Sequence, residues 1–120
     1  MGNRCSRSSG GDSSGKDAKT TIDEALASHK VMVFSKAYCP YCAGAKTALK
    51  SVMGGNSFGV MELDARGDGS AIQDELLSIT GGRSVPRVFV EGKFIGGGDE
   101  TMALAKNGEL KKMLESKGIL

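Results

Sequence analysis

The Cys-Pro-Tyr-Cys stretch at residues 39–42 constrains the fold of this 120-residue chain more than any other segment. It follows Val31–Phe34, a continuous apolar run typical of an interior, parallel strand. It also opens a helical pattern over residues 40–52. Proline suits a first helical position because that N–H has no intrahelical partner. Two thiols three residues apart thus lie at a strand-to-helix junction, an arrangement suited to electron exchange.

The rest of the pattern predicts one α/β domain at residues 20–120, after a flexible, Ser- and Gly-rich tail at residues 1–19. Capping boxes at Thr21–Glu24 and Ser70–Gln73 predict two helix starts. The expected helices are 21–28, 40–52, 70–80 and 99–117 (interrupted near 107–108), and the expected strands are 31–34, 58–63, 87–90 and 93–95. A parallel strand–helix–strand crossover followed by a hairpin predicts a thioredoxin-like fold, a four-stranded mixed sheet with helices on both faces.

Composition and charge argue against several classes of function. A net charge of +2, the absence of Trp and an aromatic content of 5% do not suit a nucleic-acid surface. No apolar segment approaches the ~20 residues that span a bilayer, and the N-terminus lacks the apolar core of a secretory signal. Three cysteines, two of them in one motif, do not form a secreted disulfide framework. We therefore expect a cytoplasmic protein in a reducing compartment.

Cys39 is the residue that we expect to act as a nucleophile. Only a thiolate attacks a disulfide, and a free thiol has a pKa of about 8.5. Cys39 precedes the first helical residue, where unpaired N–H groups and the helix dipole favour negative charge, and Lys36 can add a positive charge. Cys42 lies one turn into the helix and is expected to be the resolving thiol, which closes an internal disulfide or expels a bound partner.

The alternative for this cysteine pair is half of a zinc site. A structural zinc ion normally takes four ligands. The chain offers only Cys5, in the expected tail, and His29, its single histidine, as further thiol or imidazole ligands. The redox interpretation is therefore favoured, and no metal site is expected.

Two further segments extend the motif: Ser-Val-Pro at residues 84–86 and Gly-Gly-Gly-Asp at residues 96–99. With all three segments in this order, the chain resembles the dithiol, Cys-Pro-Tyr-Cys type of glutaredoxin over almost its whole length after residue 20, and within that type the animal glutaredoxin 2-like proteins. The resemblance implies a monomeric thiol-disulfide oxidoreductase. Its reductant and substrate would be glutathione, and its protein partners would be glutathionylated and disulfide-containing proteins.

The resemblance also implies that the Val85–Pro86 peptide bond is cis and that this turn faces the active thiols. X–Pro bonds adopt the cis form at modest cost, usually in a tight turn. The free backbone groups of Val85 would then pair with the backbone of the substrate's cysteine, as an added β-strand does. The alternative is an ordinary loop proline before an edge strand.

The remaining glutathione contacts are also implied by the resemblance. Lys36, Gln73 and Arg83 match positions that hold the glycine-end carboxylate. Tyr41 matches the aromatic residue that flanks the tripeptide, and Gly98 and Asp99 match the segment that holds the γ-glutamyl end. The alternatives are that Gln73 belongs to its capping box, Asp99 is an N-cap, Arg83 is solvated and Tyr41 covers the sheet. Glu100 stands where the family often has another acidic residue, and we leave it out of the site.

Two other activities remain as alternatives. Some glutaredoxins hold a [2Fe–2S] cluster between two subunits, using the first cysteine and bound glutathione. Pro40 disfavours this role, since a rigid proline at that position is associated in the family with poor cluster binding. A thioredoxin-type enzyme that depends on a reductase is the other alternative, and the motif lacks the Trp of thioredoxins.

The first residues fit an acylation signal. Gly2, with Ser6 at the last motif position, matches the myristoylation pattern, and Cys5 could carry a second acyl chain. Two such anchors hold a protein stably at a membrane surface, whereas one myristoyl chain does not. The alternative is an unmodified leader, because short motifs recur by chance.

Overall fold

A computed structural model of the chain describes residues 17–120. The acylation sites expected at Gly2 and Cys5 lie outside the described residues. The helices are α1 (Ala18–Ser28), α2 (Pro40–Met53), α3 (Gly69–Thr80), α4 (Gly98–Lys106) and α5 (Glu109–Ser116), with a short 3-10 helix η2 (Leu63–Ala65). The strands are β1 (Val31–Ser35), β2 (Gly59–Glu62), β3 (Arg87–Val90) and β4 (Lys93–Gly96).

The four strands form one mixed sheet in the order β2-β1-β3-β4. Strand β1 pairs parallel with β2, and β3 is antiparallel to both β1 and β4. All residues of β1 are buried, as the apolar run predicted. The hairpin between β3 and β4 turns at Glu91 and Gly92, whose φ angles of 51° and 81° are both positive. The predicted thioredoxin-like fold is confirmed.

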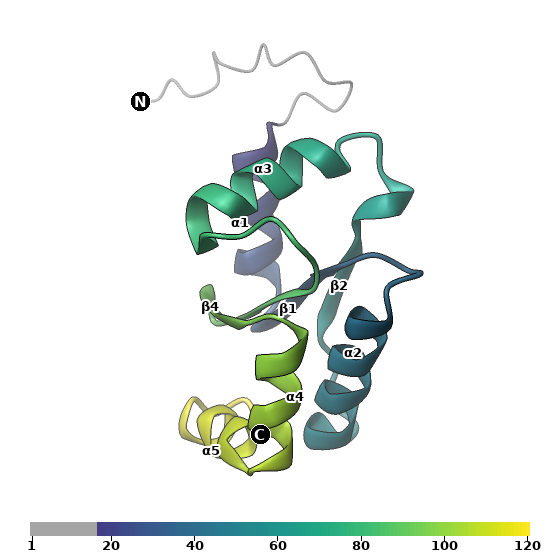
Figure 1. Ribbon diagram of the computed structural model, residues 1–120. Helices are drawn as coiled ribbons and strands as arrows, with labels where there is room; N and C mark the ends of the chain where they lie inside the picture. Colours follow the sequence, from purple (N-terminus) through teal and green to yellow (C-terminus); the bar gives the residue numbers. More distant parts are fainter. Residues whose placement is uncertain (1–16) are drawn as a thin grey trace.

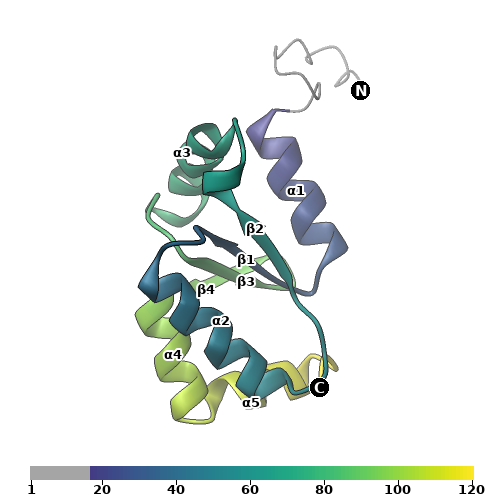
Figure 2. The same cartoon turned by 90° about the vertical axis from the view of Figure 1, so that its right-hand side faces the viewer.

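Helices cover both faces of the sheet (Figures 1 and 2). Helices α1 and α3 lie on one face, and α2, α4 and α5 lie on the other. Alternate side chains of the central strands point to opposite faces, so the sheet separates two hydrophobic cores. The core under α2, α4 and α5 contains Val31, Val33, Ala45, Leu49, Val88, Val90, Leu110 and Leu114. The core under α1 and α3 contains Ile22, Met32, Phe34, Ile72, Leu76 and Phe89.

Helix α1 begins three residues before the predicted capping box. Its N-cap is Asp17, whose Oδ1 accepts a hydrogen bond from the backbone N–H of Thr20 at 2.8 Å. The hydroxyl of Thr21 donates instead to the carbonyl oxygen of Asp17 at 3.1 Å. The start predicted at Thr21 is therefore wrong, because an equally good cap lies upstream. The domain boundary expected at residue 20 falls inside this helix.

Helix α3 also begins before its predicted cap. It starts at Gly69, and no side chain caps it, so the capping box at Ser70 and Gln73 is wrong. A Cβ atom at Gly69 would lie 2.2 Å from the carbonyl oxygen of Leu63, so glycine lets the helix start against η2. The side chain of Gln73 turns away from the helix start and donates to the backbone of Arg83.

The C-terminal helical stretch is interrupted, as predicted, between Asn107 and Gly108. Asn107 ends α4, and Gly108 precedes α5 with a φ angle of 85°. Within residues 17–120, no helix combines the length and the apolar character that a membrane span requires.

Candidate active site

The two motif cysteines lie at the start of α2, just after the carboxyl end of β1. Cys39 is the N-cap, and its Sγ accepts a hydrogen bond from the backbone N–H of Cys42 at 3.3 Å. Both thiols are free. The side chain of Cys39 is half-buried, whereas Cys42 is fully buried against the sheet. The structure therefore makes Cys39 the accessible thiol, as the sequence predicted.

The surroundings of Cys39 lower the pKa of its thiol. Partial burial opposes ionisation, but hydrogen bonds from the Cys42 thiol and from the backbone N–H groups of Cys42 and Tyr41 outweigh it. The positive charge of Lys46 acts in the same direction. The helix start thus stabilises the thiolate, as predicted, although the cation identified is Lys46 rather than Lys36.

The pKa of the Cys42 thiol is shifted in the opposite direction. Burial raises the pKa of its thiol to about 12, and the neighbouring Cys39 adds to the rise. The backbone N–H of Lys36, 3.4 Å from the Cys42 sulfur, and the charge of Lys46 reduce the effect without reversing it. As the pH rises, Cys39 therefore loses its proton first, while Cys42 remains a thiol.

Lys46 belongs to a polar network that joins α2 to the sheet beside the two thiols. Its Nζ forms an ion pair with Oε2 of Glu62, in β2, at 2.7 Å. The other oxygen of Glu62 accepts a hydrogen bond from the buried hydroxyl of Ser35, in β1. Sequence reasoning missed Lys46, although its position one turn after Cys42 places both on the same side of the helix.

Replacing Lys46 with glutamine is expected to raise the pKa of Cys39, because it removes a positive charge that favours the thiolate. A higher pKa leaves less thiolate at a given pH below it, so activity that depends on the thiolate shifts to higher pH. The ultraviolet absorbance of the thiolate, followed during a pH titration, measures the midpoint directly.

Lys50→Gln is the matched control, because Lys50 lies one turn further along α2 with an exposed side chain. This variant is expected to leave the midpoint of Cys39 unchanged. An unchanged midpoint in Lys46→Gln would contradict the role of Lys46 and leave the hydrogen bonds at the helix start as the cause of the lowered pKa.

The segment before β3 approaches the accessible thiol. The Val85–Pro86 peptide bond is cis, as predicted, and Pro86 is buried. The Sγ of Cys39 lies 3.8 Å from the carbonyl oxygen of Val85. The expected turn facing the active thiols is thus present, and it places backbone groups beside Cys39.

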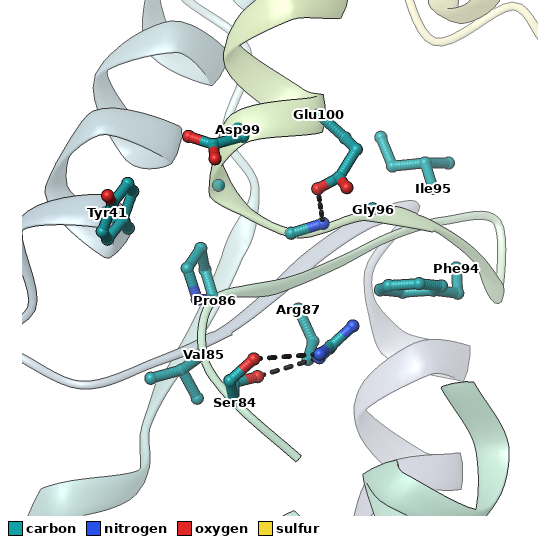
Figure 3. Close-up of a pocket in the computed structure, with 12 residues that line it drawn as sticks. Tyr41, Ser84, Val85, Pro86, Arg87, Phe94, Ile95, Gly96, Asp99 and Glu100 are labelled. Atoms are coloured by element: carbon teal, nitrogen blue, oxygen red, sulfur yellow. Dashed lines mark hydrogen bonds between the residues drawn. The ribbon is translucent and has the colours of Figure 1, made fainter. Parts of the chain in front are cut away.

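A cavity of about 620 Å³ opens next to this turn (Figure 3). It lies between the N-terminal end of α4, the start of α2 and the β3–β4 hairpin. Five predicted site residues line it: Tyr41, Val85, Pro86, Gly98 and Asp99. The other lining residues are Ser84, Arg87, Phe94, Ile95, Gly96, Gly97 and Glu100. The motif segments that are far apart in the sequence therefore meet at one hollow beside Cys39.

Four predicted site residues, Lys36, Cys39, Gln73 and Arg83, do not line this cavity, although Cys39 contacts its wall at Val85. The buried amide of Gln73 donates to the carbonyl oxygen of Arg83 at 2.8 Å. The guanidinium of Arg83 pairs with Asp74 at 3.1 Å and also contacts Ser70. The Gln73 side chain thus supports the backbone of Arg83, and the Arg83 side chain is tied to α3.

The start of α4 brings Gly98 and Asp99 to the cavity. A Cβ atom at Gly98 would lie 3.0 Å from Cβ and 3.1 Å from the carbonyl oxygen of Tyr41, so glycine allows the close approach of α4 to the motif. Asp99 is the second helical residue and not the N-cap, which is Gly97. Glu100 accepts a hydrogen bond from the Gly97 N–H at 2.9 Å, so the acidic residue that we left out stabilises the helix start.

Sequence reasoning also missed Arg87 and Phe94 in the cavity wall. Arg87 directly follows the cis-proline turn, so its position in the sequence could have indicated that it belongs to the site. No feature of the sequence indicates this for Phe94. Within residues 17–120, no three His, Cys, Asp or Glu side chains are grouped so that they could hold a metal ion.

Comparison with known proteins identifies the family. A model of the glutaredoxin family matches residues 31–95. Glutaredoxin-C4 of Arabidopsis thaliana is 43% identical over 97 residues, which are 81% of this chain and 70% of that protein. A glutaredoxin of Ricinus communis is 46% identical over 101 residues, 84% of this chain and 97% of that protein.

Solved structures agree with these sequence relatives. Oxidized glutaredoxin 2 from Chlamydomonas reinhardtii has a TM-score of 0.79 and 54% identity, covering 88% of this chain and 100% of that chain. A buckwheat glutaredoxin–glutathione complex has a TM-score of 0.74 and 40% identity, covering 86% of this chain and 94% of that chain. None of these four relatives is an animal protein. The fold, the dithiol at the start of α2 and these similarities show that the chain belongs to the glutaredoxin family, as a glutathione-dependent oxidoreductase.

Proposed function

We propose that this glutaredoxin reduces protein–glutathione mixed disulfides through Cys39. The thiolate of Cys39 attacks the glutathione sulfur, and the protein cysteine leaves as a thiolate that takes up a proton. The thiolate of a second glutathione then attacks the glutathione sulfur held on Cys39. This step releases oxidised glutathione and restores the Cys39 thiolate. The observation that carries the proposal is the lowered pKa of the accessible Cys39 beside Val85.

Protein disulfides are proposed to be reduced by both cysteines. Cys39 attacks one sulfur of the protein disulfide and becomes joined to the protein. Cys42 then attacks the sulfur of Cys39, releasing the reduced protein and closing a Cys39–Cys42 disulfide, which two glutathione molecules reduce. The Cys39 charge helps to raise the pKa of Cys42. Bonding of Cys39 to the protein removes that charge and so favours the resolving step.

Glutathione is proposed to lie along the cavity next to Cys39. The backbone of Val85, beside Pro86, pairs with its cysteine. The N–H groups at the start of α4, including that of Gly98, take the γ-glutamyl carboxylate, while the Asp99 carboxylate takes its ammonium. Tyr41 flanks the tripeptide, since its side chain is exposed at the cavity edge.

The glycine-end carboxylate is proposed to bind Lys36 and Arg83, both outside the cavity wall. Gln73 acts on this contact by holding the backbone of Arg83. The guanidinium of Arg83 is about half exposed beside Asp74, so it can still meet a carboxylate from solution.

A [2Fe–2S] carrier with glutathione as co-ligand remains the disfavoured alternative. Pro40 is the first residue of α2, and its ring fixes the backbone beside Cys39. Visible absorbance in the protein purified without oxygen would support the alternative.

The proposed partners in the cell are glutathionylated and disulfide-containing proteins, met by a cytoplasmic monomer. Attachment to a membrane surface is proposed only for a form acylated at Gly2 or Cys5. Mass spectrometry of the native N-terminus tests this part of the proposal.

The Cys42→Ser variant tests the separate roles proposed for the two thiols, Cys39 as nucleophile and Cys42 as resolving thiol. We expect it to reduce glutathione mixed disulfides at close to the wild-type rate, because that reaction uses Cys39 alone. Reduction of a protein disulfide is expected to fall to near background, since no resolving thiol remains. Equal loss of both activities, in a variant that keeps its thermal stability, would contradict these roles.

A further inference from the structure

One wall of the cavity carries a fixed cation that the proposed reaction does not use. Arg87, at the start of β3, lines the cavity together with Phe94 of β4 (Figure 3). Its guanidinium carbon lies 5.1 Å from the centre of the Phe94 ring. Its Nε donates to the carbonyl oxygen of Ser84 at 2.8 Å, and its Nη2 donates to the Ser84 hydroxyl at 3.0 Å. Three contacts therefore hold this side chain in one position beside the cis-proline turn.

Arg87 differs from the other arginines of the described part of the chain by lacking a carboxylate partner. Arg66 pairs with Asp68 at 2.8 Å, and Arg83 pairs with Asp74 at 3.1 Å. The partners of Arg87 are neutral oxygens and a ring, and they leave several of its five N–H donors free. A planar guanidinium in a fixed orientation is well suited to bind a carboxylate that comes from outside the protein.

Two acidic residues, Asp99 and Glu100, line the opposite wall of the same cavity. Neither forms an ion pair with Arg87 among the described residues. One oxygen of Glu100 is occupied by the N–H of Gly97, and Asp99 is the proposed partner of the glutathione ammonium. The cavity thus has an anionic wall on α4 and a cationic wall on the β3–β4 hairpin. The proposed function gives the cationic wall no ligand.

We propose that Arg87 binds an Asp or Glu side chain next to the reacting cysteine of the client protein. The inference rests on the proposed function, in which the client cysteine is joined to glutathione and comes close to Cys39. Val85 contacts Cys39 and lines the same cavity as Arg87. An extended chain advances about 3.3 Å per residue, so the proposal places the residues next to the client cysteine along this wall. Phe94 then contacts the methylene groups of the acidic side chain.

Glutathionylated peptides test the proposal on the wild-type protein. Three peptides would differ only beside the cysteine, where they carry Glu, Gln or Lys. We expect kcat/KM to be about fivefold higher for the Glu peptide than for the Gln peptide, and lowest for the Lys peptide. The preference is expected to shrink as salt is added, because salt screens partly exposed charges. Equal rates for the three peptides at low salt would overturn the proposal.

Variants of Arg87 assign the preference to this side chain. Arg87→Gln is expected to remove the preference, and Arg87→Glu is expected to reverse it in favour of the Lys peptide. Lys111→Gln is the matched control, because it removes an exposed cation on α5 and should keep the wild-type preference. A preference that persists in Arg87→Gln would place the carboxylate site elsewhere and overturn the proposal.

A small substrate separates the client's carboxylate from those of glutathione. The mixed disulfide of glutathione and 2-mercaptoethanol has no client residue and no charge outside glutathione, so Arg87→Gln should reduce it at the wild-type rate. An equal loss on this compound and on the Glu peptide would show that Arg87 binds glutathione itself, and would overturn the proposal. Failure of the proposed function would look different, since the wild-type protein would then reduce none of these substrates.

Discussion

Replacing Cys39 with serine is expected to abolish the reduction of both glutathione mixed disulfides and protein disulfides. A serine hydroxyl does not form the attacking anion near neutral pH, and the other thiol of the motif, Cys42, is fully buried, which raises its pKa. The loss is expected to be on the order of 10³-fold or more, as for other nucleophile removals. Steady-state reduction of the mixed disulfide of glutathione and 2-mercaptoethanol, coupled to glutathione recycling, measures it.

The third cysteine of the chain provides the control for this variant. Cys5 lies outside the described residues and has no role in the proposed reaction, so Cys5→Ser is expected to keep both activities. Thermal unfolding should show that Cys39→Ser is folded, because its side chain lies at a helix start and not in a core. Substantial activity in the folded Cys39→Ser protein would assign the nucleophile to Cys42 and contradict the proposed mechanism.

Replacing Phe89 with alanine is expected to cost about 3–5 kcal/mol of unfolding free energy, the usual range for a buried Phe. Phe89 lies in β3 with 1% of its surface exposed, and its ring centre is 5.6 Å from those of Phe34 and Phe94. Its removal leaves a cavity in the core under α1 and α3. Urea unfolding, followed by circular dichroism, gives the change in free energy.

Leu77→Ala is the control for the stability measurement. Leu77 lies on α3 with 46% of its surface exposed, and its truncation is expected to change the unfolding free energy by less than about 0.5 kcal/mol. A loss below about 1 kcal/mol for Phe89→Ala would mean that the surrounding side chains refill the space, and that the aromatic cluster does not determine the stability of the sheet.

The fold was predictable where local and global signals agree. The run Val31–Phe34 is apolar at every position, and the helix after it opens with proline, so a buried strand followed by a helix was evident. Helix starts were less predictable, because capping patterns are short and compete with one another. Helix α1 is capped by the upstream Asp17 and not by Thr21. The start of helix α3 is determined by the close contact of Gly69 with η2.

The residues of the candidate site that belong to a sequence motif were predictable. Those that are brought together only by tertiary contacts were not. The cis-proline turn and the start of α4 are contiguous segments, and the structure places both at the cavity, with Val85 of the turn in contact with Cys39. Lys46 and Glu62 come from different elements, so only the packing of α2 on the sheet reveals their ion pair. Arg87 and Phe94 come into contact through the pairing of β3 with β4, and no sequence motif predicts this contact.

The cavity borders both hydrophobic cores. Val85 and Phe94 rest on the core beneath α1 and α3, whereas Ile95 rests on the core beneath α2, α4 and α5. A bound tripeptide or peptide therefore touches groups anchored in both halves of the interior. We expect a shift of either helical layer on the sheet to change the spacing of these wall residues, so that sequence changes far from the thiols can alter substrate binding in the cavity.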